Sequence, residues 1–153
     1  MGLFSRNKKV EIPNESSYDI ELNLKEAIEY AGQLRIKLNY SNESITRLDE
    51  VLMIYYEDFK KYNEEMNTYQ NTAKLFGTYL GEVIRRNWLF DYKWTDYNGS
   101  DYRRPVLEKQ VDELTSFIVD PTDEVLKRML NGEEHSVYKY FREIQNKAIQ
   151  HEL

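Results

Sequence analysis

The sequence has no cysteine, and it has only two histidines and three prolines among its 153 residues. The lack of cysteine excludes disulfide bonds, thiolate nucleophiles and zinc sites built on cysteine. His135 stands beside Glu133 and Glu134, and His151 is two residues from the end, so the chain has no His-x-x-x-His or Glu-x-x-His pair of metal ligands. We therefore expect neither a metal site nor a cofactor.

Long apolar runs are absent as well. No stretch approaches the roughly 20 apolar residues of a membrane-spanning helix, and residues 1–9 hold too short an apolar run for a signal peptide. These absences predict no membrane span and a cytoplasmic location. The formal net charge of −6 works against attraction to phosphate backbones, which makes nucleic acid an unlikely partner.

Aromatic residues, by contrast, are abundant. They make up 14% of the chain, with 13 tyrosines, and hydrophobic residues make up 41%, which argues against disorder. The length suits one domain with a real core. Residues 1–21 are polar and are expected to form a flexible arm, while residues 22–153 are expected to form a single globular domain.

Apolar residues at helical spacing predict five helices, over about 24–39, 45–62 and 66–86, and starting near 121 and 136. Asn23 and Glu26 resemble a capping box for the first of them. Asp120-Pro121 and Ser136 are typical starts of the last two. Within the third helix, Gly77 and Gly81 stand four residues apart and indicate a close approach by another helix or by a hairpin.

The periodicity changes at residue 88. Trp88, Phe90, Tyr92 and Trp94 occupy alternate positions, which predicts one face of a strand that points into the core. Asn98-Gly99 favours a type I′ hairpin turn after this strand.

A return strand with Tyr102, Val106 and Leu107 would follow the turn, and Pro105 indicates that it is an edge strand. Residues 114–119 would form a third strand or a connector. The predicted fold class is therefore α+β, with about five helices packed on a small two- or three-stranded antiparallel hairpin sheet.

Two carboxylates stand beside apolar residues of predicted helices. Glu82 follows Gly81, and Asp49 follows Leu48. A buried acid of this kind could have a raised pKa and act as a proton donor. The simpler interpretation is an ion pair on the helix surface, for Glu82 with Arg85 or Arg86 three or four residues later.

A cluster of cationic and aromatic residues flanks the predicted hairpin, and these residue types are enriched at protein–protein contacts. If the alternating aromatics point inward, the arginines and the turn remain outside. The candidate binding residues are Arg85, Arg86, Tyr97, Tyr102, Arg103 and Arg104. The same cluster could stack the bases of single-stranded nucleic acid, although the acidic chain disfavours it.

Several short motifs occur in an order that resembles a loosely defined group of small, uncharacterised bacterial proteins. The most distinctive motif is Tyr79-Leu80-Gly81-Glu82, followed by Trp88 or Trp94. The remainder comprises Ser44-Ile45, Leu48-Asp49, Pro105-Val106, Asp120-Pro121 and Lys127-Arg128 before Asn131-Gly132. The resemblance implies no established activity. Such proteins often accompany toxin or secretion loci, which implies an immunity or accessory role.

Three functions remain open from the sequence. The leading hypothesis is a non-catalytic factor that binds another protein. The first alternative is a small enzyme that acts on an anionic substrate through Glu82 or Asp49 with nearby arginines. The second, weaker alternative is a protein that binds single-stranded nucleic acid. The serine-hydrolase, phosphate-loop and dinucleotide-binding motifs are absent from the chain.

Overall fold

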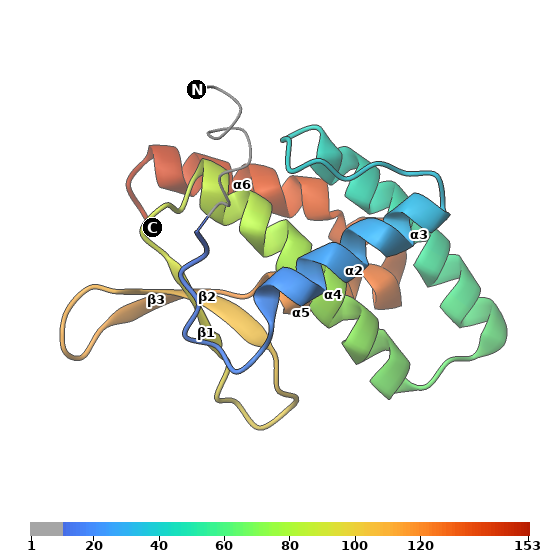
Figure 1. Ribbon diagram of the computed structural model, residues 1–153, viewed down its shortest axis with the longest axis horizontal. Helices are drawn as coiled ribbons and strands as arrows, with labels where there is room; N and C mark the ends of the chain where they lie inside the picture. The colour runs from blue at the N-terminus through green and yellow to red at the C-terminus, as the bar shows by residue number, and fades with distance from the viewer. Residues whose placement is uncertain (1–10) are drawn as a thin grey trace, which may run out of the picture.

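A computed structural model describes residues 11–153 (Figure 1). Its helices and strands are α2 (Ile20–Gln33), α3 (Ser44–Tyr62), α4 (Met66–Asn87), β1 (Lys93–Asp96), β2 (Pro105–Gln110), β3 (Ser116–Val119), α5 (Pro121–Asn131), the short 3-10 helix η1 (Gly132–His135) and α6 (Val137–Ile149). The predicted α+β class is confirmed, with five α-helices and three strands among the described residues. The first ten residues of the predicted N-terminal arm lie outside them.

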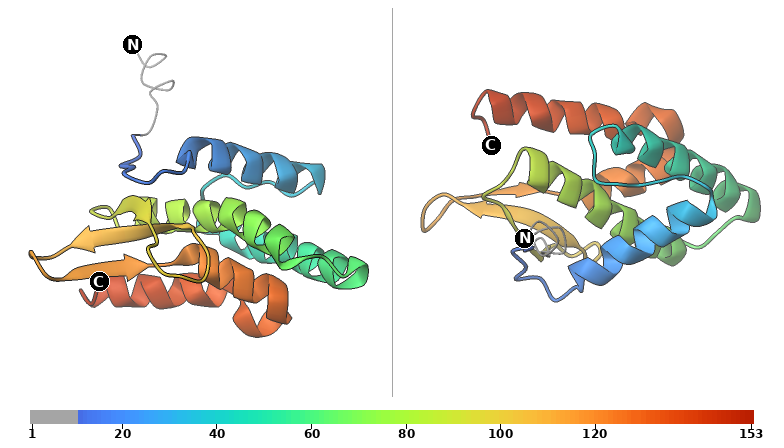
Figure 2. Two further views of the ribbon diagram at one scale, coloured as in Figure 1. Left: turned by 90° about the horizontal axis from the view of Figure 1, so that it is seen from below. Right: turned by 45° about the horizontal axis from the view of Figure 1, so that its top comes forward.

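Helix α4 forms the centre of the molecule. It packs against α5 on one side and α2 on the other, so that α2, α4 and the α5–α6 pair lie in successive layers (Figure 2). Helix α3 contacts both α5 and α6. Phe76, Tyr79, Leu80, Val83 and Ile84 of α4 have no solvent exposure. A helix apolar on this many sides must be enclosed by its neighbours. None of the helices within residues 11–153 is long and apolar enough to cross a membrane.

The helix starts follow from their capping side chains. Asp120 accepts a hydrogen bond from the Asp123 amide at the start of α5, and Ser136 accepts one from the Lys139 amide at the start of α6, as predicted. The predicted capping box at Asn23 and Glu26 is wrong. Helix α2 begins at Ile20, where Asp19 caps it by accepting from the Leu22 amide.

The sheet is antiparallel in the order β1-β2-β3. Trp94, Leu107 and Val119 are directly opposite one another across its three strands. Side chains opposite one another share a face, and these three are buried in the core. Helices α4 and α5 both contact β2, so this face of the sheet packs on the helices.

The expected strand over residues 88–94 is wrong in its first part. Helix α4 continues to Asn87, Trp88 ends it, and β1 begins only at Lys93. The alternation of aromatics therefore spans a helix end and a turn, where a period of two has no structural meaning. Tyr92 and Trp94 point inward as predicted, but Phe90 is 71% exposed.

Strand β2 confirms the predicted return strand for Val106 and Leu107, but Tyr102 lies before it, and the predicted turn and edge position are wrong. Asp96 pairs with Pro105, so residues 97–104 form a long connection instead of a type I′ turn at Asn98-Gly99. Strand β2 is the central strand, and Pro105 does not make it an edge. Pro105 is its first residue, where a missing backbone N–H is tolerated.

The outer edge of β1 is covered by the chain before α2. The Trp94 amide donates to the Pro13 carbonyl at 2.9 Å, and the Glu15 amide donates to the Trp94 carbonyl at 2.9 Å. The Ser16 hydroxyl and the Ser17 amide both donate to the Asp96 carboxylate. Residues 13–17 of the predicted arm thus contact the sheet. Strand β3 has no pairing segment on its outer edge within residues 11–153.

Gly77 and Gly81 mark the close approach that the sequence indicates. A Cβ at Gly77 would meet the Cα of Thr122 at the start of α5. A Cβ at Gly81 would stand 2.5 Å from Cη2 of Trp94 and 2.7 Å from Cγ of Pro121. Both a helix and the sheet therefore occupy this side of α4, and only glycine leaves room for them.

Candidate binding surfaces

A buried ion cluster joins the end of α4 to β1. Glu82 has no solvent exposure. Arg85 binds it through both carboxylate oxygens, at 2.8 and 2.9 Å, and Nε of Arg86 donates to Oε2 at 2.7 Å. The indole Nε1 of Trp94 donates to Oε1 at 3.1 Å. The helical spacing of three and four residues places both arginines beside one carboxylate.

The cluster decides the chemistry of Glu82. Burial alone would raise the pKa of the Glu82 carboxyl, but hydrogen bonds from Arg85, Arg86 and Trp94 outweigh burial and hold that pKa below its ordinary value. The raised pKa considered for a proton donor is therefore wrong. The predicted ion pair with Arg85 and Arg86 is present, but its expected place on the helix surface is wrong, because Glu82 is buried. Glu82 remains a carboxylate that holds α4 and β1 together.

Asp49 has a comparable structural role at another junction. Its carboxylate accepts hydrogen bonds from Nε of Arg128, the Ser136 hydroxyl and the amides of Val137 and Tyr138. It thus caps α6 and ties that helix to α3 and α5. Within residues 11–153, no group of three or more histidine and acidic side chains is arranged to hold a metal ion.

The second predicted arginine pair is divided between core and surface. Arg104 is 4% exposed. It forms ion pairs with Asp120 at 2.8 Å and with Asp101 at 3.2 Å. Its guanidinium lies 3.8 Å from the ring centroid of Tyr97 and 4.2 Å from that of Tyr102. Arg103, the adjacent residue, is exposed.

Five of the six candidate binding residues therefore fall into two groups, and the exposed Arg103 belongs to neither. Arg85 and Arg86 share Glu82, whereas Tyr97, Tyr102 and Arg104 stack on one another beside α5. The expectation that the arginines remain outside is wrong for Arg85 and Arg104, which are 6% and 4% exposed. Each is buried because a carboxylate compensates its charge.

The β2–β3 hairpin is the most exposed apolar part of the described chain. Leu114 at its turn is 97% exposed, Val111 is 51% exposed, and Phe117 and Ile118 of β3 are 39% and 54% exposed. The turn points away from all the helices (Figures 1 and 2). The candidate binding residues predicted from the sequence include none of these positions. The signal that could have found them is the lack of any charge in residues 114–119.

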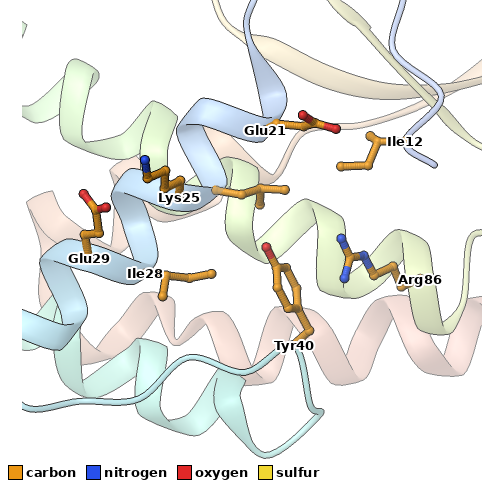
Figure 3. A pocket seen from close by; sticks show the side chains of 8 residues that line it. Ile12, Glu21, Lys25, Ile28, Glu29, Tyr40 and Arg86 are labelled. Carbon is orange, nitrogen blue, oxygen red and sulfur yellow. The ribbon is translucent and has the colours of Figure 1, made fainter. Parts of the chain in front are cut away.

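A groove of about 620 Å³ lies between α2 and the loop before α3 (Figure 3). Its apolar lining comes from Ile12, Leu24 and Ile28, and its polar lining comes from Tyr40 and from four charged side chains, Glu21, Lys25, Glu29 and Arg86. The guanidinium carbon of Arg86 lies 4.0 Å from the centroid of the Tyr40 ring. Arg86 is thus the one predicted binding residue that both joins the Glu82 cluster and lines this groove.

Tyr40 has an unusual backbone conformation. Its φ of 65° lies in the left-handed region, which is costly for a bulky side chain. The Tyr40 amide donates to the hydroxyl of Tyr79 at 2.9 Å, and that hydroxyl also shares a 2.6 Å hydrogen bond with Ser44. These bonds hold the strained residue in place. Nothing in the local sequence predicts it, because the partner is 39 residues away.

Comparison of the chain with protein-family models, with curated proteins and with solved structures finds no match. The resemblance to small bacterial proteins thus stays a hypothesis based on short motifs. The structure assigns several of these motifs to packing: Gly81 and Glu82 contact Trp94, and Asp120-Pro121 starts α5.

Proposed function

We propose that this protein is a non-catalytic factor that binds another protein, and that the β2–β3 hairpin is its contact element. The observation that carries the proposal is the exposed, uncharged edge of β3 with apolar side chains on both faces. Ile118 is opposite Glu108 and Phe117 is opposite Lys109, so these two side chains lie on opposite faces of the sheet. A contact that clasps the hairpin would cover both.

Strand addition fits this geometry. An edge strand presents free backbone N–H and C=O groups, and most proteins protect such edges with charges, prolines or bulges. Residues 13–15 cover the edge of β1, but β3 has neither a covering segment within residues 11–153 nor a charged residue. A partner that adds a strand would gain main-chain hydrogen bonds and apolar contacts together.

The finer form of the proposal is an immunity or accessory factor of a bacterial cytoplasm, which acts by covering a partner's surface. It rests on the motif resemblance and on the net charge of −6, which suits a basic partner. No observation favours the enzyme alternative, since Glu82 is inaccessible and Asp49 caps α6. The nucleic-acid alternative loses support because Arg85 and Arg104 are paired with carboxylates.

The test is affinity capture from the native host with the full chain and two sets of variants. Leu114→Asp and Ile118→Asp place a charge on the hairpin, while Met66→Asp and Ile149→Asp do so at exposed apolar positions elsewhere. We expect a partner that wild type and both controls capture, with about tenfold or greater loss for the hairpin variants, because a charge there must be desolvated. Equal capture by hairpin variants and controls would exclude the hairpin as the contact.

The immunity form has its own measurement. If the captured partner is an enzyme or a toxin, its activity should fall when the wild-type chain is added in excess. The Leu114→Asp variant should leave that activity intact. Capture without inhibition would support an accessory role instead of an immunity role.

A further inference from the structure

We propose that the groove between α2 and Tyr40 binds a small amphipathic carboxylate, in which an apolar chain ends in a carboxylate held by Arg86. The site is separate from the hairpin and does not rest on the proposed function. Three observations carry it: an excess positive charge at Arg86, the fixed position of Tyr40 and the apolar lining opposite them.

The charge excess follows from the Glu82 cluster. One carboxylate faces two guanidinium groups, and Arg85 binds both of its oxygens. Neither Arg85 nor Arg86 forms another ion pair within residues 11–153. The Arg86 side chain is 23% exposed and lines the groove. A half-buried cation without a full counter-charge attracts an anion more strongly than an exposed one.

The geometry of Arg86 suits a carboxylate. Its Nε is occupied by Glu82, which fixes the plane of the guanidinium, and the Arg86 side chain is also hydrogen-bonded to Tyr40, so a ligand carboxylate would be shared between Arg86 and the Tyr40 hydroxyl. Planar guanidinium groups bind carboxylates through two parallel hydrogen bonds. The fixed guanidinium would lose little freedom on binding.

Tyr40 adds a second donor. The strained backbone of Tyr40 and its contact with Arg86 direct the ring so that the hydroxyl points into the groove (Figure 3). Burial raises the pKa of the Tyr40 hydroxyl, although Arg86 counteracts part of this effect, so the group stays protonated at neutral pH. A strained residue at the inner end of a groove is a recognised mark of a binding site.

The rest of the groove accommodates the apolar chain. Ile12, Leu24 and Ile28 supply the apolar lining. The side chains of Lys25 and Glu29 extend away from the Tyr40 hydroxyl (Figure 3). The volume of about 620 Å³ lies within the range of small-molecule sites. The ligand's charge thus belongs at the inner end, beside Arg86, and its apolar chain along α2.

The test is calorimetric titration of the full chain with decanoate, octanoate and hexanoate, and with 1-octanol as an uncharged analogue. We expect one saturable site, with affinity falling about fourfold for each methylene removed. Octanoate should bind at least about tenfold more tightly than 1-octanol, because only octanoate makes charge-assisted hydrogen bonds.

Two variants with matched controls locate the site. Arg86→Gln should weaken octanoate at least about tenfold, while Arg142→Gln, which removes an exposed arginine of α6, should not. Because Arg86→Gln also alters the Glu82 cluster, Ile28→Asp provides an independent test that leaves that cluster intact. Ile28→Asp should abolish decanoate binding, and Ile149→Asp should preserve it. No saturable binding of decanoate, equal affinity for octanoate and 1-octanol, or unchanged binding by Ile28→Asp would each overturn the proposal.

Discussion

The end of α4 and the β2–β3 hairpin are opposite extremes of the same molecule. Around Glu82, a fully buried carboxylate receives hydrogen bonds from Arg85, Arg86 and Trp94. At the hairpin, Leu114 is 97% exposed, and the outer edge of β3 is unpaired within residues 11–153. The first region is a buried, hydrogen-bonded ion cluster that connects α4 to β1. The exposed apolar side chains of the second region have no packing role within the described part of the chain.

This difference changes where function should be sought. Charged residues near aromatic ones look functional in a sequence, yet most of those in this chain hold the fold together. Arg104 forms ion pairs with Asp120 and Asp101, and Arg128 forms one with Asp49. The surfaces left for recognition are those whose side chains have no such partner. The hairpin is one such surface, and the groove beside Arg86, which has to share Glu82 with Arg85, is the other candidate.

The largest effect is expected from Glu82→Ala. It would leave the buried Arg85 and the half-buried Arg86 beside each other without their carboxylate, and breaking a buried pair typically costs about 3–5 kcal/mol. Chemical denaturation should therefore show a large fall in the free energy of unfolding. As a control, Asp91→Ala removes an exposed carboxylate whose partner is Lys109, and it should cost only about 0–1 kcal/mol. Similar losses for the two variants would show that the Glu82 cluster does not stabilise the fold more than an exposed ion pair does.

The second effect concerns the contact of α4 with α5 and β1. Gly81→Leu would drive a side chain into Trp94 and Pro121, and overpacking costs about 1–3 kcal/mol or more. Gly32→Ala is the matched control, because a Cβ there meets nothing within 4 Å. It should leave stability unchanged or raise it by up to about 1 kcal/mol through helix propensity. A Gly81→Leu variant with the melting temperature of wild type would mean that α5 and β1 are not in contact with α4 at this residue.

Adjacent arginines give the third comparison. Arg104→Ala would leave the carboxylate of Asp120 without its partner and would remove a cation stacked on Tyr97 and Tyr102. A loss of about 2–3 kcal/mol is expected, as for other charge-assisted contacts. Arg103→Ala removes an exposed side chain and should change stability by less than about 0.5 kcal/mol. Thermal melts of the two single variants separate these outcomes, and equal melting temperatures would contradict the burial of Arg104.

These neighbours illustrate what the sequence can predict. Helical periodicity and capping residues located α3, α4, α5 and α6 nearly to the residue, because those signals act within a few positions. The Gly77 and Gly81 spacing correctly predicted a close approach, since glycine in a helix needs a reason. The ion pair of Glu82 followed from its three- and four-residue distance to two arginines.

The predictions are wrong where residues far away in the sequence determine the local structure or the burial of a side chain. Phe90 is exposed and Tyr92 is buried because α4 ends at Asn87 and β1 starts only at Lys93. No local signal in the sequence sets these two boundaries. Pro105 looked like an edge residue, but β3 pairs with β2 on the other side. Arg103 and Arg104 are indistinguishable in sequence, and Asp120, 16 residues after Arg104, determines which of them is buried. The strained Tyr40 likewise depends on Tyr79.

A smaller, pH-dependent effect is expected from Tyr92. Burial, with a contribution from Asp91, raises the pKa of its hydroxyl to about 12, and the hydroxyl has no hydrogen-bond partner among residues 11–153. Tyr92→Phe should therefore raise stability at neutral pH by about 1 kcal/mol. Because the folded state favours the protonated form, wild-type stability is highest, as far as Tyr92 is concerned, below the ordinary pKa of 10, and it falls as the pH rises to about 12.

Urea denaturation at pH 8 and at pH 10.5 measures this difference. Wild type should lose more stability than Tyr92→Phe between the two values, with the remaining tyrosines common to both proteins. A variant that is less stable than wild type at pH 8 would show that the hydroxyl has a partner in solution.

The smallest effect on stability is expected at the hairpin, where the proposed function predicts the largest effect on binding. Leu114 is almost fully exposed at the turn, so Leu114→Asp removes no buried contact and should change the free energy of unfolding by less than about 0.5 kcal/mol. Denaturation of the purified variant checks this value directly. Glu82→Ala and Leu114→Asp would then have contrasting effects on stability, because a surface residue that contacts only a partner can change without loss of folding stability, whereas a buried ion cluster cannot. A loss above about 1 kcal/mol would mean that Leu114 packs against the protein itself, and the hairpin would then be part of the core and not a contact element.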